Sequence, residues 1–288
     1  MQVYHEAKCM TSLHYCYEKK YNTILEDDSV KNPIGVFDTG VGGLSCVGPI
    51  IEKMPDESII FFGDCLRAPY GDRPAKEIKK FSVEMAAYLV SRGCKALVIA
   101  CNTISCTALN DIQQAFPSVP VIGIIDPAAR AIAKLHLDEV IVISTEATAK
   151  SGAYANAVGK LCHAKVIAKG CPKFVPIIEG GKTGSKEAED AVHSHMDDIV
   201  KEDSTVVTGC THYPFIASDI QRVYPSVRIL NPAEALAEEV FDILKEKGLL
   251  SDGPAEYEFS ASLMTETFKK LADSVMGEKE YSLTEHIL

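Results

Sequence analysis

Residues 96–115 read ALVIACNTISCTALNDIQQA, and this stretch decides the fold. Its first five residues are apolar without a break, which is typical of a strand covered by helices on both faces. Residues 105–115 then place apolar side chains at helical spacing. The polar tripeptide Cys101-Asn102-Thr103 separates the two patterns. The stretch is therefore predicted to form one strand–helix unit of a parallel sheet.

The same alternation runs outward from this unit in both directions, from Asn32 to near the end of the chain. Helical patterns occupy 74–92 and 186–201. The other strand candidates are the short apolar runs 34–37, 59–62, 119–124, 140–144, 164–168, 205–208 and 227–230. Regular alternation of this kind predicts an α/β protein with doubly wound parallel sheets.

Polar clusters at the predicted strand ends recur in two matched halves. Asp38 and Ser144 each end a strand and are 106 residues apart, and Cys101 and Cys210 are 109 residues apart. This near-equal spacing indicates two similar α/β units. Because ligands bind beyond the carboxyl ends of parallel strands, one cleft between the units could collect all four clusters.

Composition excludes several classes of protein. The chain has 288 residues, is 47% hydrophobic and carries a net charge of −11, which is typical of an ordinary globular protein. So acidic a chain is a poor general binder of nucleic acid, and it lacks a polybasic stretch for an anionic membrane. No apolar run approaches the roughly 20 residues that span a bilayer, and the N-terminus lacks a secretory signal. We therefore expect a cytoplasmic protein whose ten cysteines are mostly reduced.

Cys101 and Cys210 are the strongest candidates for chemistry, because each follows an apolar strand at the start of a predicted helix. A helix N-terminus lowers the pKa of a thiol and can also hold a substrate carboxylate. The pair could instead be structural, form a disulfide, or bind a metal with His212, although no Cys-x-x-Cys or His-x-x-x-His spacing favours zinc. A further interpretation is acid–base chemistry on two faces of one carbon, with one thiolate removing a proton and the other thiol returning one.

Other polar residues near these strand ends have less specific interpretations. Asp38 precedes glycines that allow a tight turn, but the segment lacks the lysine of a phosphate-binding loop. His212 can tune the proton affinity of Cys210. By composition alone, Glu179 belongs to a surface loop, and Tyr70-Gly71 is a turn whose hydroxyl could close on a ligand.

Together these motifs resemble the bacterial glutamate racemases of the cofactor-independent aspartate/glutamate racemase superfamily. The resemblance covers about residues 32–277 and rests on five segments: DTGVGGL at 38–44, GDxxRxPYG at 63–71, ACNT at 100–103, CPKFVPIxE at 171–179 and GCTHYP at 209–214. It implies an isomerase that interconverts L- and D-glutamate for peptidoglycan synthesis without pyridoxal phosphate, another cofactor or a metal. It also implies a cytoplasmic enzyme that is commonly a homodimer.

The resemblance assigns a role to each matched residue. Cys101 and Cys210 would be the two proton donor/acceptors, with Asp38 assisting Cys101, and with His212 and Glu179 assisting Cys210. The residues that would bind the amino acid are Asp38, Thr39, Tyr70, Gly71, Asn102, Thr103, Thr148, Thr211 and His212. Thr39 stands where the family usually has serine, and Asn231-Pro232 where Asp-Ser is more usual.

The resemblance also implies a division of the chain into domains. Residues 33–125 with 233–288 would form the first α/β domain and 126–232 the second. Residues 1–32 match nothing in the family; their apolar spacing favours an amphipathic helix, either a regulatory or dimer-contacting extension or an irregular start. Two other functions stay open: an aspartate racemase, whose substrate is one methylene shorter, and a module that closes on an amino acid without reacting.

Overall fold

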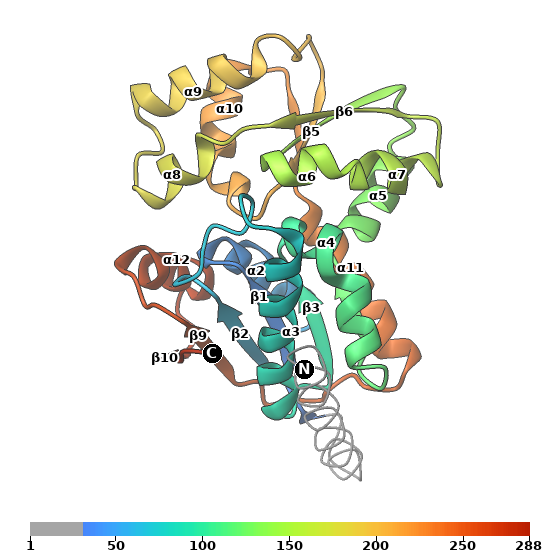
Figure 1. The fold of residues 1–288 in the computed structure, drawn as a ribbon, viewed down its shortest axis with the longest axis vertical. Helices are drawn as coiled ribbons and strands as arrows, with labels where there is room; N and C mark the ends of the chain where they lie inside the picture. Colours follow the sequence, from blue (N-terminus) through green and yellow to red (C-terminus); the bar gives the residue numbers. More distant parts are fainter. Residues whose placement is uncertain (1–30) are drawn as a thin grey trace, which may run out of the picture.

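A computed structural model of the chain describes residues 31–288. The helix expected in the N-terminal extension falls on residues outside this described part. Figure 1 shows two α/β units stacked along the long axis of the molecule, and each unit is called a layer below. The larger layer includes both the first and the last strands, and the smaller layer comes from the middle of the chain.

Each layer is built on a parallel sheet. The larger sheet has the order β10-β9-β2-β1-β3-β4, and the smaller has the order β6-β5-β7-β8. All pairings between neighbouring strands are parallel. The strands are β1 (Ile34–Asp38), β2 (Ile59–Gly63), β3 (Ala96–Ile99), β4 (Val121–Gly123), β5 (Glu139–Ser144), β6 (Lys165–Gly170), β7 (Thr205–Gly209), β8 (Arg228–Leu230), β9 (Tyr257–Ala261) and β10 (Ser282–Glu285).

The two sheets share one winding pattern, which accounts for the internal symmetry of the sequence. In the order β2-β1-β3-β4, the chain moves outward from β1 to β2 and then crosses back to β3; β6-β5-β7-β8 repeats this path. Asp38 and Ser144 end the first strand of each unit, and the two cysteines follow the third. The predicted doubly wound α/β fold is therefore confirmed, and ligand sites are expected where the winding direction switches.

Helices cover both faces of each sheet. One face of the larger sheet packs against α2 (Leu44–Lys53), α11 (Pro232–Glu246) and α12 (Glu266–Met276), and the other against α3 (Ala75–Ser91) and α4 (Asn102–Ala115). One face of the smaller sheet packs against α5 (Ile125–Lys134) and α7 (Ala153–Gly159), and the other against α8 (Phe174–Glu179), α9 (Lys186–Met196) and α10 (Ala217–Val223). Three short elements complete this list: α6 (Glu146–Ser151), η2 (Val41–Gly43) and η3 (Tyr213–Ile216).

The core follows from the alternation of side chains along buried strands. Val36 and Val142 belong to one apolar cluster that extends across both layers, whereas their neighbours Phe37 and Ile143 face separate clusters on the outer sides. Since successive strand residues point to opposite faces, both faces must be apolar, which explains the unbroken apolar runs in the sequence.

Some predicted boundaries were wrong. The helix expected over 186–201 ends at Met196, and Glu179 ends the short helix α8 rather than lying in a loop. Strands β9 and β10 were not predicted at all. No helix within the described residues is both long and apolar enough to cross a membrane.

Candidate active site

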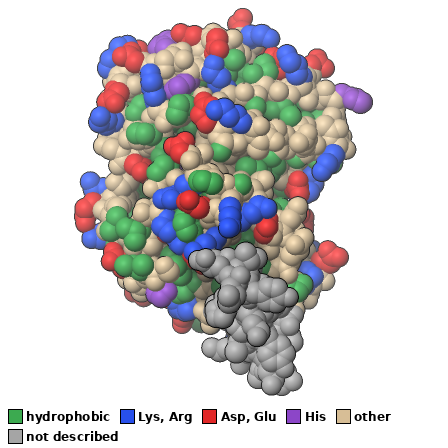
Figure 2. All heavy atoms as spheres, in the orientation of Figure 1, with side chains coloured by type: hydrophobic (Ala, Val, Ile, Leu, Met, Phe, Trp, Pro, Cys, Tyr) green, Lys and Arg blue, Asp and Glu red, His purple; other side chains and the backbone are tan. Residues whose placement is uncertain are grey.

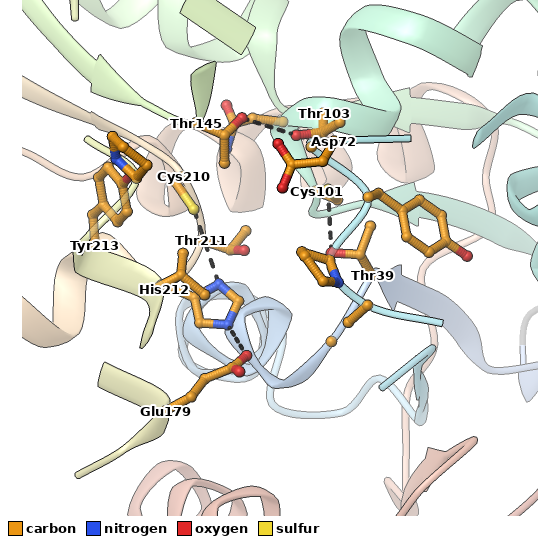
Figure 3. Close-up of a pocket in the computed structure, with 18 of the residues that line it drawn as sticks. Thr39, Asp72, Cys101, Thr103, Thr145, Glu179, Cys210, Thr211, His212 and Tyr213 are labelled. Atoms are coloured by element: carbon orange, nitrogen blue, oxygen red, sulfur yellow. Dashed lines mark hydrogen bonds and ion pairs between the residues drawn. The ribbon is translucent and has the colours of Figure 1, made fainter. Parts of the chain in front are cut away.

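A pocket opens between the carboxyl ends of the two sheets, and both layers contribute to its walls (Figure 3). Ten of the predicted site residues line it: Thr39, Tyr70, Gly71, Cys101, Asn102, Thr103, Glu179, Cys210, Thr211 and His212. Asp38 and Thr148 do not line the pocket; they are buried directly behind it and bond to residues that do. The tertiary structure thus brings together residues that are far apart in the chain, such as Thr211 and Asp38, which are 173 positions apart.

The wall formed by the larger sheet presents Cys101. This residue precedes α4, and its thiol donates to Thr39 Oγ1 at 3.9 Å, while the Thr39 hydroxyl donates to Asp38 Oδ1 at 3.3 Å. A chain of hydrogen bonds therefore connects the sulfur to a buried carboxylate through one hydroxyl.

Burial decides the protonation of Cys101. Burial, and then the negative charge of Asp38, raise the pKa of the Cys101 thiol well above its usual value. The backbone N–H of Ile104 at the start of α4 and the Thr39 hydroxyl oppose this rise without overcoming it. The expectation that the helix N-terminus lowers this pKa is therefore wrong, because loss of hydration outweighs one amide hydrogen bond. Cys101 keeps its proton in the resting site.

Asp38 connects the two walls. Its carboxylate accepts hydrogen bonds from the Gly40 N–H at 3.0 Å and from the hydroxyl of Thr211, in the opposite layer, at 3.0 Å. Burial raises the pKa of Asp38, although the charge of His212 and these donors act against it. Because Asp38 is fully buried and bonded to donors from both layers, it acts on the pocket only through its neighbours.

The opposite wall presents Cys210 with a second chain of hydrogen bonds. Cys210 Sγ lies 3.9 Å from His212 Nδ1, and His212 Nε2 lies 2.9 Å from Glu179 Oε1. Figure 3 shows this line from Cys210 through the imidazole to the glutamate on one side of the cavity, with Cys101 and Thr39 across from it. Each thiol therefore has its own polar chain that ends in a carboxylate.

His212 carries a positive charge at neutral pH. Burial disfavours that charge, but the hydrogen bonds to Cys210 and Glu179 and the nearby negative charges outweigh it and raise the pKa of His212 to about 10. A cation this close to Cys210 Sγ stabilises negative charge on that sulfur. The two walls thus have matching chains of hydrogen bonds from a thiol to a carboxylate, but only the chain at Cys210 contains a positively charged histidine.

Tyr70 does not offer its hydroxyl to a ligand, contrary to the sequence-based interpretation. The side chain is buried, and its hydroxyl donates to the buried carboxylate of Asp64. Asp64 also accepts from Arg67 Nε at 2.5 Å and from Ser262 Oγ at 2.8 Å. Asp64 therefore anchors the loop after β2, and Tyr70 lines the pocket with its hydroxyl already bonded to Asp64.

Several lining residues were not singled out from the sequence: Cys65, Asp72, Thr145, Glu146, Val175 and Tyr213. Thr145 had the clearest signal, because it follows β5 as Thr39 follows Asp38 in the other unit. Its hydroxyl lies 3.2 Å from Thr103 Oγ1 across the cleft and donates to Thr148 Oγ1 at 3.1 Å. Thr148 thus belongs to a cluster of three hydroxyls that joins the layers. Within residues 31–288, no group of three or more His, Cys, Asp or Glu side chains is placed to hold a metal ion.

Similarity to known proteins agrees with this geometry. Residues 46–240 match the family model described as Asp/Glu/Hydantoin racemase. A glutamate racemase of Thermus thermophilus is 41% identical over 221 residues, covering 77% of this chain and 83% of that protein. A glutamate racemase of Lysinibacillus sphaericus is 38% identical over 248 residues, covering 84% of this chain and 93% of the relative.

A solved structure has the same architecture. The crystal structure of glutamate racemase from Francisella tularensis in complex with D-glutamate superimposes with a TM-score of 0.82 at 31% identity, covering 90% of this chain and 98% of that one. Fold and pocket together therefore define an isomerase with the two-domain α/β racemase fold. More specifically, the chain belongs to the Asp/Glu/Hydantoin racemase family.

Proposed function

We propose that this protein is a glutamate racemase that inverts the α-carbon by proton transfer between Cys101 and Cys210. The observation that carries the proposal is the matched placement of the two thiols, each after the third strand of its unit and each on its own wall of one pocket. A carbon held between them is open to a base on one face and to an acid on the other.

The unequal charges of the two walls suggest how the first proton moves. In one direction Cys210 acts as the base and removes the α-proton from one face of the substrate, with the positive charge of His212 beside it. Cys101, which keeps its proton, donates it to the opposite face of the carbanion, so the configuration inverts. One proton has then left the substrate and one has been returned, and the thiol and thiolate have exchanged places. The reverse reaction starts from that second state.

Other parts of the proposal rest on the family resemblance. Residues 33–125 with 233–288 form one domain and 126–232 the other, and the amino acid binds to the lining residues assigned above, with Asp38 and Thr148 acting through their neighbours. The enzyme works in the cytoplasm as a homodimer, needs no cofactor, and supplies D-glutamate for peptidoglycan. The named relatives at 38–41% identity support glutamate as the substrate.

Hydrogen exchange in D₂O tests the mechanism. The proton removed by one thiol is not the proton that the other returns, so product formed early should carry deuterium at Cα while unreacted substrate stays largely protiated. NMR of the Cα–H signals, combined with polarimetry, follows both species from either enantiomer.

Each other outcome contradicts part of the proposal. Product that retains the original proton would indicate a single base. Binding of glutamate without any change in optical rotation would indicate a non-catalytic module. A kcat/KM for aspartate at or above that for glutamate would identify an aspartate racemase, since one methylene is worth only about 1–3 kcal/mol in a pocket.

The charge on His212 predicts a basic limit to activity. His212 loses its proton as the pH rises through about 10, so kcat/KM should fall there. Glu179→Gln removes the negative charge that stabilises protonated His212. The basic limb of the pH profile, where kcat/KM falls, should therefore move to lower pH by about one unit. The measurement is a pH profile of kcat/KM for both proteins. Glu187→Gln, which alters an exposed glutamate paired with Lys182, is the control and should leave the limb in place. An unmoved limb in Glu179→Gln would contradict the role given to the His212–Glu179 pair.

A further inference from the structure

Tyr154 lies outside the predicted site, yet it forms a hydrogen bond to a residue of that site from the opposite layer. It belongs to α7 and is 2% exposed, and its hydroxyl donates to Asn102 Oδ1 at 2.7 Å. Asn102 is the first residue of α4, immediately after Cys101. This hydrogen bond therefore crosses between the layers and ends on a side chain that lines the pocket.

The direction of this hydrogen bond determines which end of the Asn102 amide is occupied. Burial raises the pKa of Tyr154, so the phenol keeps its proton, and it donates that proton to Asn102 Oδ1. A donating hydroxyl requires the amide oxygen on its side, which leaves the NH₂ group turned away from Tyr154.

The NH₂ group of Asn102 has no hydrogen-bond acceptor among residues 31–288, although Asn102 is only 3% exposed. A buried donor without an acceptor costs free energy, and beside a pocket a bound ligand can supply the missing acceptor. The complement of an N–H donor beside a helix N-terminus is an anionic oxygen. An amino-acid substrate brings such oxygens in its carboxylates.

We propose that Tyr154 is a positioning residue: by donating to Asn102 Oδ1 it turns the amide so that Nδ2 donates to a carboxylate oxygen of the substrate. The inference rests on the proposed function, since it takes the ligand to be the amino acid.

Two variants test the orientation of the amide in the full-length enzyme. Tyr154→Phe removes only the hydroxyl, and KM for glutamate should rise about 3- to 10-fold, the usual worth of one hydrogen bond, with a smaller change in kcat. Asn102→Asp keeps an acceptor for Tyr154 but replaces the NH₂ by an oxygen. It should raise KM more strongly, because two negatively charged groups then face each other. A fall in KM in Asn102→Asp would overturn the proposal, since it would mean that the amide oxygen meets the substrate ammonium.

A double-variant comparison separates positioning from a general structural role. If Tyr154 acts through Asn102, Tyr154→Phe should leave KM unchanged in an Asn102→Ala background. Tyr224→Phe, which removes a hydroxyl bonded to Asp197 near α9, is the control and should keep both KM and kcat. An equal rise in KM with and without Asn102, or no rise in Tyr154→Phe alone, would refute the inference.

Failure of this inference is distinguishable from failure of the proposed function. The wild-type protein is assayed for racemisation in the same series. If it racemises glutamate and Tyr154→Phe has the wild-type KM, only the role proposed for Tyr154 is refuted. If the wild-type protein does not racemise glutamate, both proposals are refuted, whatever the variants do.

Discussion

Replacing either Cys101 or Cys210 by alanine is expected to lower kcat for glutamate racemisation by at least about 10²–10⁴-fold, the usual worth of a positioned acid or base. Each change removes the proton carrier from one wall and leaves the other wall intact. Racemisation needs both walls, so neither variant should invert the substrate efficiently in either direction. Polarimetry with L- and D-glutamate measures the loss.

The two variants should also differ from each other. The remaining thiol can still remove the α-proton of the enantiomer whose Cα–H bond points toward that thiol, and it can return a deuteron to the same face. In D₂O, Cys101→Ala should therefore exchange one enantiomer without inverting it, and Cys210→Ala the other. Cys46→Ala is the matched control, because Cys46 is equally buried but lies on α2 outside the pocket lining. Efficient racemisation in either site variant would disprove the two-thiol mechanism.

Gly42→Ala is expected to reduce kcat/KM by about 10²-fold or more, although residue 42 has no side chain to contribute. A Cβ on Gly42 would overlap His212 Nδ1 and lie 2.6 Å from Thr211 Oγ1. His212 and Thr211 would have to move away, and both hydrogen-bond chains depend on their positions. Displacement of His212 separates its charge from Cys210, and displacement of Thr211 breaks its hydrogen bond to Asp38.

Gly48→Ala is the control for this prediction. Gly48 lies in α2, where the nearest atom to a new Cβ is Val275 Cγ1 at an ordinary 3.7 Å. The new methyl group meets no atom of the pocket, so this variant should keep its activity. Steady-state kinetics and thermal unfolding of both variants are compared. Wild-type kinetics in Gly42→Ala would mean that the close approach of the two layers at this residue is not needed for activity.

Most of the strands that the sequence predicted share a simple property. The strands around Val36, Val98 and Val142 are buried beneath helices on both faces of their sheet, so local composition alone identifies them. The two strands that were missed lack this property. In β10 all four residues are exposed, and β9 (Tyr257–Ala261) mixes polar and apolar residues and owes its place to pairing with β2, far away in the sequence.

The residues of the candidate site also divide into those that a local pattern identifies and those that only distant contacts bring together. Cys101, Cys210, Asp38 and His212 were all identified from short motifs, because each ends or closely follows a buried strand and lies at the carboxyl edge of its own parallel sheet. The NH₂ of Asn102 and its partner Tyr154 could not be paired from the sequence, since they are 52 residues apart and no local pattern relates them.

The sequence by itself determined the α/β class, the twofold repeat and the two cysteines, because these depend on local periodicity and on residues directly after strands. Only the tertiary structure decided how the two halves meet. The glycines after Asp38 were expected to permit a tight turn, but neither Gly42 nor Gly43 has a positive φ. They are required because Gly42 lies against His212 from the other layer and Gly43 lies against Asp38 and Phe61. The protonation of Cys101 was likewise settled by burial rather than by its place at a helix start. Close approach and burial depend on residues distant in sequence, and so they follow only from the packing of the two layers.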